Sequence, residues 1–128
     1  MVTKVTGGVK VSVETFYQPQ YSDPRVNHFV FAYRIVIENN TEHSVQLMRR
    51  HWIIIDADGQ HREVEGEGVV GEQPQIKPGE QYTYVSGCNL NCEIGKMYGS
   101  YEMHRIADQR KFKVKIPEFI MTSDGKNN

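Results

Sequence analysis

Alternation of apolar and polar residues constrains the fold of this chain more than any other feature of its sequence. The run at residues 9–14, VKVSVE, places three valines on one face of an extended chain. The run at residues 28–38, HFVFAYRIVIE, places five large apolar side chains on one face and is rich in β-branched residues. Successive side chains of a strand point to opposite faces, so this period of two predicts half-buried strands. No segment shows a convincing helical period.

The same pattern recurs along the chain at short intervals, separated by turn-forming residues. We expect seven strands, at about residues 9–17, 28–38, 44–56, 60–66, 81–86, 97–105 and 111–117. Many short strands without helices are typical of an all-β sandwich of antiparallel sheets, of the immunoglobulin or fibronectin type III-like kind. Trp52 fits this architecture, because such sandwiches often bury a large aromatic residue.

Two local pairings follow from the turns between these strands. Residues 39–42, NNTE, form a turn, so we expect strands 28–38 and 44–56 to pair as neighbours. The sequence Ala57-Asp58-Gly59 predicts a hairpin that returns the chain through the charged strand 60–66. Its charges suit the edge of a sheet, because they discourage pairing with other chains.

Length and charge exclude several classes of protein. The 128 residues suit one domain, residues 1–128, with a core at about 9–120 and a frayed polar tail from Thr122. No apolar run approaches the roughly 20 residues that span a membrane. A formal net charge of −1 gives no general attraction toward nucleic acid, for which a basic face would be expected. The N-terminus lacks a secretory pattern, so we expect a cytoplasmic protein in which Cys88 and Cys92 are reduced thiols.

The stretch Gly66–Gly71, GEGVVG, spells the G-x-G-x-x-G fingerprint of dinucleotide-binding proteins. A true fingerprint follows a buried parallel strand and opens a helix whose N-terminus meets the pyrophosphate. Here the preceding residues HREVE are too charged for such a strand, and Pro74 and Pro78 fall where the helix would begin. We therefore interpret Gly66, Gly68 and Gly71 as turn residues that allow positive φ or a close approach of neighbours.

An anion-binding loop is the alternative interpretation of the same glycines. Successive backbone N–H groups could form an anion-binding nest, assisted by Arg49 or Arg50. Glu67 and Glu72 flank the loop and would repel a phosphate.

Metal binding is the next hypothesis that the sequence raises. Six carboxylates crowd into seventeen residues: Asp56, Asp58, Glu63, Glu65, Glu67 and Glu72. Hard cations take such oxygen ligands, but the calcium-loop pattern is incomplete, and a charged sheet edge explains the acids more simply. Cys88, Cys92 and His104 supply at most three ligands at loose spacing, where a structural zinc site needs four. We therefore expect no metal site.

Arginine and tryptophan next to each other point to recognition of another protein. Arg49, Arg50 and Trp52 combine residue types that recur at interaction hot spots. The alternative is that one arginine faces solvent, the other lies on the sheet and Trp52 packs in the core. The five histidines form no recognisable nucleophile or metalloprotease motif, so the residues indicate no enzyme.

The run RRHWIIIDADGQHREVEGEGVVGEQPQIKPGEQYTYVSG, continuing to KMYGSYEM, closely resembles the bacterial ApaG proteins. The shared features are the arginine and tryptophan before a D-A-x-G turn, the G-x-G-V-V-G-E-Q-P segment, the P-G-E turn, Tyr-x-Ser-Gly and the M-x-G-x-Y strand. The resemblance covers about residues 9–120. Cys92 and His104 depart from the usual pattern of that family.

The resemblance implies a fibronectin type III-like sandwich of about seven strands. It also implies protein–protein recognition, because similar domains occur in eukaryotic F-box proteins and in a DNA-polymerase-interacting protein. Bacterial members are linked by name to cobalt and magnesium resistance or efflux. The family has no catalytic residues to carry over, and its glycine motif, discussed as a pyrophosphate binder, maps onto Gly66, Gly68 and Gly71.

Taken together, these observations predict a non-catalytic binding module without a cofactor. We expect Gly66, Gly68, Gly71, Glu72, Arg49, Arg50 and Trp52 to form its binding surface for a protein partner. Binding of phosphate, pyrophosphate or a dinucleotide polyphosphate by the GEGVVG loop is the alternative. Exposed sheet edges would also permit a homodimer.

Overall fold

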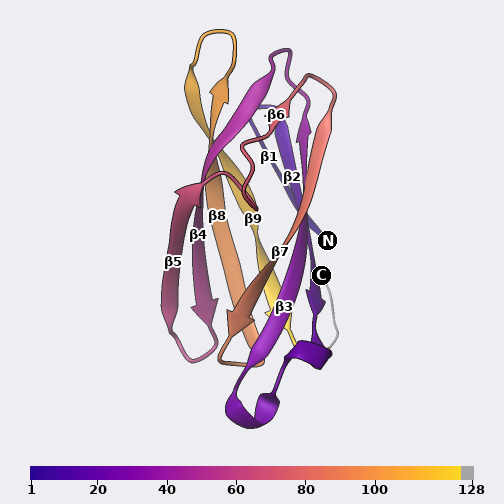
Figure 1. Cartoon of the computed structure of the whole chain (residues 1–128), viewed down its shortest axis with the longest axis vertical. Coiled ribbons are helices and arrows are strands. Elements are labelled where there is room, and N and C mark those ends of the chain that lie inside the picture. The colour runs from indigo at the N-terminus through magenta and orange to yellow at the C-terminus, as the bar shows by residue number, and fades with distance from the viewer. Residues whose placement is uncertain (125–128) are drawn as a thin grey trace.

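The computed structural model describes residues 1–124 as two antiparallel sheets packed face to face (Figure 1). The first sheet has the order β1 (Val2–Thr6), β2 (Val9–Tyr17), β3 (Phe29–Asn39) and β7 (Gln81–Leu90). The second has the order β5 (His61–Glu67), β4 (Val45–Asp56), β8 (Ile94–Arg105) and β9 (Lys111–Thr122), and the short β6 (Gln75–Ile76) pairs with β4. Two 3-10 turns, Pro19–Tyr21 and Pro24–Val26, lie in the connection between β2 and β3.

The expected all-β sandwich is confirmed, and each of the seven expected strands is present. β1 and β6 are additional, and the strands expected at 81–86, 97–105 and 111–117 are longer than their alternation indicated. Residues 125–128 of the expected tail lie outside the described residues. Residues 1–124 contain no helix with the length and hydropathy of a membrane span.

The core lies between the sheets, where the inward faces of the alternating strands meet. Val9, Val11 and Val13 are buried on β2, as their spacing predicted. Trp52 of β4 lies at the centre, with its ring centroid 5.5 Å from that of Tyr33 and 5.9 Å from that of Phe119. The first ring comes from the opposite sheet, so the tryptophan joins the two layers.

The expected pairing of the second and third predicted strands is wrong. β3 pairs with β2 and β7, whereas β4 pairs with β5, β6 and β8, so the turn between β3 and β4 crosses from one sheet to the other. Asn39 fixes this crossing: its buried amide donates to the carbonyls of His43 and Ile76, each at 2.8 Å. Alternation predicts strands but carries no information about which sheet each strand joins.

A β-bulge in β4 explains why the middle of that strand is polar on both faces. The register with β8 shifts between Leu47 and Arg49, which leaves Met48 as an extra residue. Inward positions are therefore odd before the bulge, as at Leu47, and even after it, as at Trp52. The shift turns Arg50 inward and leaves Arg49 exposed.

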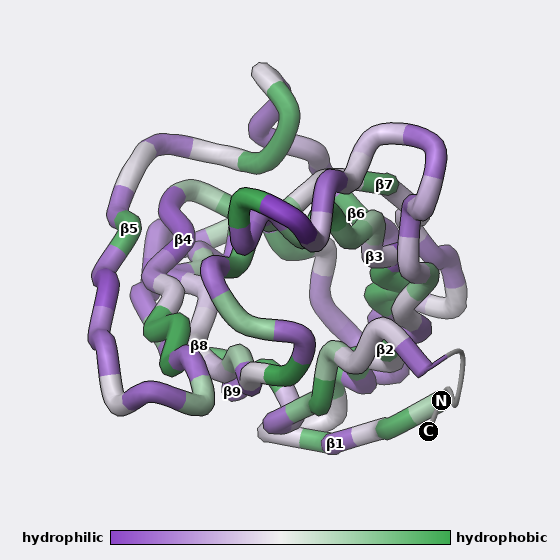
Figure 2. The backbone as a smooth tube through the Cα atoms, turned by 90° about the horizontal axis from the view of Figure 1, so that it is seen from below, coloured by the Kyte–Doolittle hydropathy of each residue, from purple (hydrophilic) through white to green (hydrophobic). Residues whose placement is uncertain are grey.

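The two sides of the sandwich differ in how they are closed. On one side β1 lies beside β9, where the amide of Lys115 donates to Thr6 Oγ1 at 3.2 Å (Figure 2). On the other side the edge strands are β5 and β7, and a side chain spans the gap: Arg62 of β5 donates to the carbonyl of Asn89 in β7. Both pockets described below lie between β5 and β7, and we call this side the open flank.

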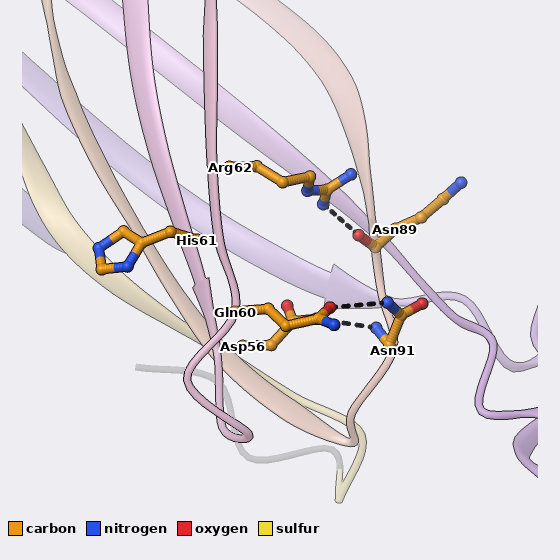
Figure 3. A pocket seen from close by; sticks show the side chains of 6 residues that line it. All are labelled: Asp56, Gln60, His61, Arg62, Asn89 and Asn91. Atoms are coloured by element: carbon orange, nitrogen blue, oxygen red, sulfur yellow. Dashed lines mark hydrogen bonds between the residues drawn. The ribbon is translucent and has the colours of Figure 1, made fainter.

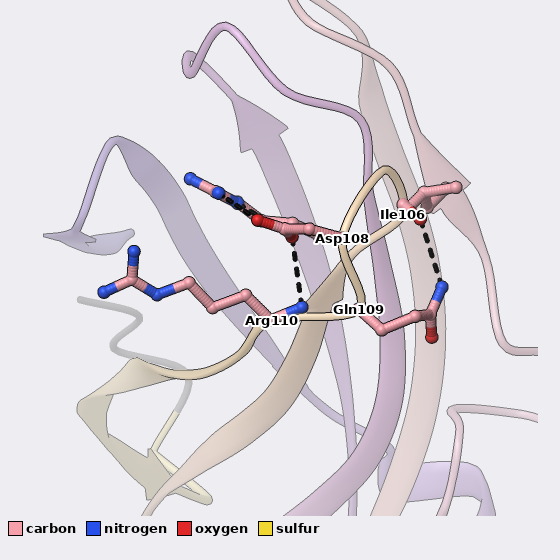
Figure 4. Close-up of polar contacts among 5 residues, drawn as sticks. Ile106, Asp108, Gln109 and Arg110 are labelled. Atoms are coloured by element: carbon pink, nitrogen blue, oxygen red, sulfur yellow. Dashed lines mark hydrogen bonds and ion pairs between the residues drawn. The ribbon is translucent and has the colours of Figure 1, made fainter.

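The β8–β9 turn at the far end shows how an exposed carboxylate is satisfied in this fold (Figure 4). Asp108 pairs with Arg105, and its Oδ1 also accepts the amide of Arg110 at 3.1 Å. These contacts lower the pKa of Asp108 to about 2, with the hydrogen bond from Arg105 as the largest cause. Figure 4 also shows Gln109 Nε2 donating to the carbonyl of Ile106, at 3.1 Å.

Candidate functional site

The stretch that spells the dinucleotide fingerprint forms a tight β-turn, which we call the glycine hairpin (Gly66–Glu72). Val69 and Glu72 exchange backbone hydrogen bonds of 2.8 and 2.9 Å across a two-residue loop. The loop residues Val70 and Gly71 have φ of 44° and 81°. Positive φ at both central positions defines a type I′ turn, so no helix starts here and the prediction from the two prolines is confirmed.

Each of the three glycines has a local structural reason. Gly68 has φ of 63°, and a Cβ at this position would lie 2.1 Å from the carbonyl oxygen of Glu72. A Cβ on Gly66 would lie 2.9 Å from the guanidinium of Arg50. Gly71 has open space around it but needs positive φ. The interpretation of the glycines as turn and close-approach residues is therefore confirmed.

Arg50 fastens the glycine hairpin to the sandwich. Its Nη1 donates to the carbonyls of Glu67 and Gly68 at 2.9 and 3.0 Å. The bulge contributes as well, because the carbonyl of Met48 accepts from the Gly68 amide at 2.8 Å and from Gln73 Nε2 at 3.0 Å. Arg49 points to the opposite face, so Arg50 alone of this pair reaches the hairpin.

A pocket of about 290 Å³ lies between the glycine hairpin and β7. It is lined by Tyr33, Arg50, Trp52, Glu67, Val69, Val70, Gly71, Tyr84 and Ser86. The hydroxyls of Tyr84 and Tyr101 lie 2.5 Å apart, and burial raises the pKa of both tyrosines and of Tyr33. The pocket therefore offers neutral hydroxyls, an apolar wall and one guanidinium, which suits binding more than chemistry.

An anion nest has few free amides in this arrangement. The N–H groups of Gly68, Val69 and Glu72 all donate to carbonyls of the chain itself. Within residues 1–124, Arg50 has no carboxylate oxygen within 4.0 Å, so its charge is directed at backbone carbonyls. The guanidinium and the amides of Val70 and Gly71 are what such a ligand would meet.

The structure brings most of the predicted surface together and adds a residue that was missed. Arg50, Gly71 and Trp52 line one pocket, although Trp52 is only 2% exposed and forms its wall. Val70 was missed, and it is 54% exposed at the tip of the turn. Its positive φ gives no signal in the sequence, because β-branched residues rarely adopt that conformation.

The six clustered carboxylates separate into three groups. Glu67 and Glu72 belong to the glycine hairpin. Glu63 and Glu65 lie on the outer face of β5, with Oε2 and Oε1 at 3.2 and 3.5 Å from Nε2 of His51. Asp56 ends β4 and Asp58 lies in the β4–β5 turn, and both lie close to Cys92 of the β7–β8 turn.

The thiols and His104 do not share a site. Cys88 is buried, and its Sγ accepts from Arg62 at 3.5 Å, whereas Cys92 is half-buried in the β7–β8 turn. Both are free thiols, as expected. His104 lies far along β8, where it pairs with Lys111 of β9.

A second pocket of about 330 Å³ opens at the other end of the open flank (Figure 3). It is lined by Asp56, Gln60, His61, Arg62, Asn89 and Asn91. Figure 3 shows Gln60 and Asn91 joined across it, with Asn91 Nδ2 donating to Gln60 Oε1 at 3.1 Å, while the ring of His61 points away. Nothing in the spacing of these six residues marked them as neighbours.

Comparison with known proteins agrees with this geometry. The ApaG domain matches residues 19–105. A Protein ApaG from Pseudomonas paraeruginosa is 50% identical over 117 residues, which cover 91% of this chain and 92% of that protein. A Protein ApaG from Brucella canis is 46% identical over 121 residues, covering 94% and 92%. The crystal structure of the putative ApaA protein from Bordetella pertussis has a TM-score of 0.86 and 43% identity, covering 89% of this chain and 92% of the other. The chain therefore belongs to the ApaG family.

Proposed function

We propose that the chain is a non-catalytic recognition module that binds another protein through the glycine hairpin. The observation that carries this proposal is Val70, an apolar side chain that is 54% exposed at a backbone φ of 44°. For a β-branched residue this conformation costs about 1–2 kcal/mol. Strain of this kind persists where the surrounding structure imposes it, and it concentrates at binding sites.

The surroundings of Val70 support a role as an anchor for a partner. The hairpin is held by Arg50 from below and by the bulge carbonyl of Met48 at its base, so the turn does not relax. The neighbouring Glu72 is exposed, and the pocket beside the tip has a wall of aromatic rings. Arginine and tyrosine are enriched at interaction hot spots, and the pocket beside Val70 is lined by Arg50 and by tyrosine rings.

A recognition role also fits the chemistry that the pocket offers. Among the residues that line it, no hydrogen bond joins a hydroxyl to a carboxylate, and burial holds its tyrosines neutral. The cobalt and magnesium association implied by the family would then act through the bound protein.

Site-specific photocrosslinking tests the proposal. A photoreactive phenylalanine replaces Val70 in the protein expressed in its native cell, and the same substitution at Val26 is the matched control, because Val26 is also exposed and apolar. We expect irradiation to give a discrete adduct with one protein at position 70 and none at position 26. Arg50→Gln and Glu72→Gln, introduced in the same protein, should weaken the adduct. Equal adduct patterns at both positions, or no adduct at all, would contradict the proposal.

Binding of pyrophosphate is the second candidate, favoured by the guanidinium of Arg50 beside Gly71 in one pocket. Titration with pyrophosphate and with a dinucleotide polyphosphate, followed by amide chemical shifts, tests it. Saturable shifts at Val70 and Gly71 that Arg50→Gln removes would support this function. Unchanged shifts from Gly66 to Gly71 would end it.

We propose β7 as the edge that would pair in a homodimer. Its ten residues carry no charged side chain, and Val85 is 58% exposed. Self-pairing of β5 would instead set its carboxylates against one another, and β1 has Lys4 at its centre. Sedimentation equilibrium tests this: Val85→Lys should abolish a dimer that Val26→Lys leaves intact, and a monomer at all concentrations would contradict it.

A further inference from the structure

Asp56 is a buried carboxylate whose bonding is incomplete. The residue is 7% exposed, and its Oδ1 has no hydrogen-bond partner in the described part of the chain. Its Oδ2 accepts the amide of Asn91 at 3.2 Å. No lysine, arginine or histidine nitrogen lies within 4.0 Å of it in residues 1–124. A buried carboxylate is normally stabilised by a cation or by several hydrogen-bond donors. The Asp56 carboxylate therefore lacks a compensating positive charge.

Two further metal-ligand atoms stand beside Asp56. A carboxylate oxygen of Asp56, one of Asp58 and the Sγ of Cys92 all lie within 4.8 Å of one another. Asp56 ends β4, Asp58 lies in the β4–β5 turn, and Cys92 lies in the β7–β8 turn at the same end of the sandwich. We call this group the turn junction. Residues about 35 positions apart meet here because both sheets end at the same level.

From these observations we infer that the turn junction binds a divalent transition-metal ion of the zinc type. Asp56, Asp58 and Cys92 supply two oxygens and one sulfur, and a water completes a tetrahedron. Thiolate disfavours magnesium and calcium, which take oxygen ligands, whereas zinc accepts sulfur and carboxylate together. Three protein ligands leave one position open, because His61 is turned away (Figure 3).

The surrounding hydrogen bonds hold the ligands near the geometry that an ion needs. The Asp56 amide donates to the carbonyl of Gln60 at 3.0 Å, and Asp58 Oδ1 accepts the Gln60 amide at 3.1 Å. The Ala57 amide donates to the carbonyl of Ile94 at 3.1 Å, which ties the two turns together. The backbone of Asp56 is therefore fixed, while the more exposed side chains of Asp58 and Cys92 are free to move toward an ion. Outer hydrogen bonds of this kind orient metal ligands.

The other candidate cluster is a weaker host. His51, Glu63 and Glu65 lie on the exposed outer face of the sheet, and the ring nitrogen of His51 already contacts both carboxylates. Water reaches all three side chains, so no unmet charge has to be compensated there. The contrast between the two clusters supplies the control for the experiment.

Calorimetric titration of the full chain with Zn²⁺, and ultraviolet titration with Cd²⁺, test the inference. We expect one Zn²⁺ per chain, release of the Cys92 thiol proton to the buffer, and a sulfur-to-cadmium charge-transfer band. Cys92→Ser should remove the band, and Asp58→Asn should weaken Zn²⁺ binding by at least about 10-fold, as loss of even an outer partner does. Both side chains are at least partly exposed, so neither variant should fail to fold.

Two control variants locate the ion. Cys88→Ser should keep the cadmium band, and the double variant Glu63→Gln/Glu65→Gln should keep the full zinc affinity. A band that depends on Cys88, zinc binding that depends on Glu63 and Glu65, or no saturable binding below about 1 mM, the range of weak extracellular-type sites, would each overturn the inference.

Discussion

The glycine hairpin and the turn junction lie on the same open flank, yet they use their polar groups in opposite ways. In the hairpin, the amides of Gly68, Val69 and Glu72 are all bonded within the chain, and Arg50 is bonded to two carbonyls. At the turn junction, a carboxylate oxygen of Asp56 stays buried without a partner. The stretch with the sharper sequence signature is thus the one whose polar groups are better satisfied.

This difference separates two ways in which a fold can prepare a binding surface. The hydrogen bonds of the hairpin hold a strained, apolar tip in one conformation. The hairpin therefore offers a partner a surface of fixed shape. The turn junction holds its groups in place but leaves charge uncompensated, so what it offers is affinity for a cation. Substitutions that release the strain should therefore act on the hairpin, and changes of charge or solvent access should act on the junction.

The largest loss of stability should come from Gly68→Ala, because a Cβ at this position meets the most crowded backbone of the hairpin. The new Cβ would lie 2.1 Å from the carbonyl oxygen of Glu72, at a φ of 63°. We expect the free energy of unfolding to fall by more than about 2 kcal/mol. The cost of a left-handed backbone at alanine and the cost of the clash with the Glu72 carbonyl add together. Urea denaturation monitored by Trp52 fluorescence measures the loss.

Gly71→Ala is the matched control, since Gly71 also has positive φ but has open space around it. It should lose only about 1 kcal/mol, the strain alone. Equal losses for the two variants would mean that Gly68 is not a close-approach residue.

The buried tyrosine pair behind the hairpin pocket, Tyr84 and Tyr101, should make the protein sensitive to alkali. Burial raises the pKa of Tyr84 and Tyr101, so the folded state holds both phenols neutral, whereas the unfolded chain ionises near the ordinary value of 10.0. This contribution to stability is fully present below pH 10 and is lost progressively as the pH rises above it. Urea midpoints measured from pH 8 to pH 11 should fall at the alkaline end.

Tyr84→Phe should flatten that decline and lower stability at neutral pH by about 1–2 kcal/mol, because it leaves the Tyr101 hydroxyl unpaired. A decline of the same steepness in this variant would assign the alkaline effect to other groups.

Sequence reasoning reached the hairpin because its decisive signals were local. The two prolines after the glycines excluded a helix, and three glycines in six residues implied tight turns, which the φ values of Gly68 and Gly71 confirm. Alternation likewise predicted the strands themselves. It did not predict the bulge at Met48 that turns Arg50 inward, because one extra residue in a strand leaves no mark in composition.

The turn junction could not be predicted, since its members meet only through the topology of the two sheets. The expected pairing of strands 28–38 and 44–56 would have placed the β4–β5 turn in the wrong sheet. The sequence groups Asp56 with the acids that follow it, whereas in space it lies beside Cys92, in the turn after β7. Contacts between sheets depend on crossovers such as the one at Asn39, and periodicity does not show them.

A smaller effect, of the opposite sign, should come from Val70→Asn. Asparagine tolerates positive φ and favours the first central position of a type I′ turn, so we expect stability to rise by about 1 kcal/mol. Val26→Asn, at another exposed valine without positive φ in the structure, should change stability by less than about 0.5 kcal/mol. Thermal and urea denaturation compare the pair. A gain in stability together with weaker binding of the photocrosslinked partner would show that the strain serves recognition, whereas lower stability would mean that the valine side chain packs favourably at the tip.

The smallest structural perturbation compares the two thiols at the end of the open flank. Cys88 is buried and burial raises its pKa, so little thiolate forms there, whereas Cys92 is half-buried in a turn. Because thiolate is the reactive form, alkylation by iodoacetamide at pH 8, followed by mass spectrometry, should modify Cys92 well before Cys88. Zn²⁺ should slow the reaction of Cys92 and leave that of Cys88 unchanged, if the ion sits at the turn junction. Equal alkylation rates at the two thiols without zinc would show that the open flank opens enough to expose Cys88. The hydrogen bonds would then not hold the flank closed, and they would no longer distinguish the glycine hairpin from the turn junction.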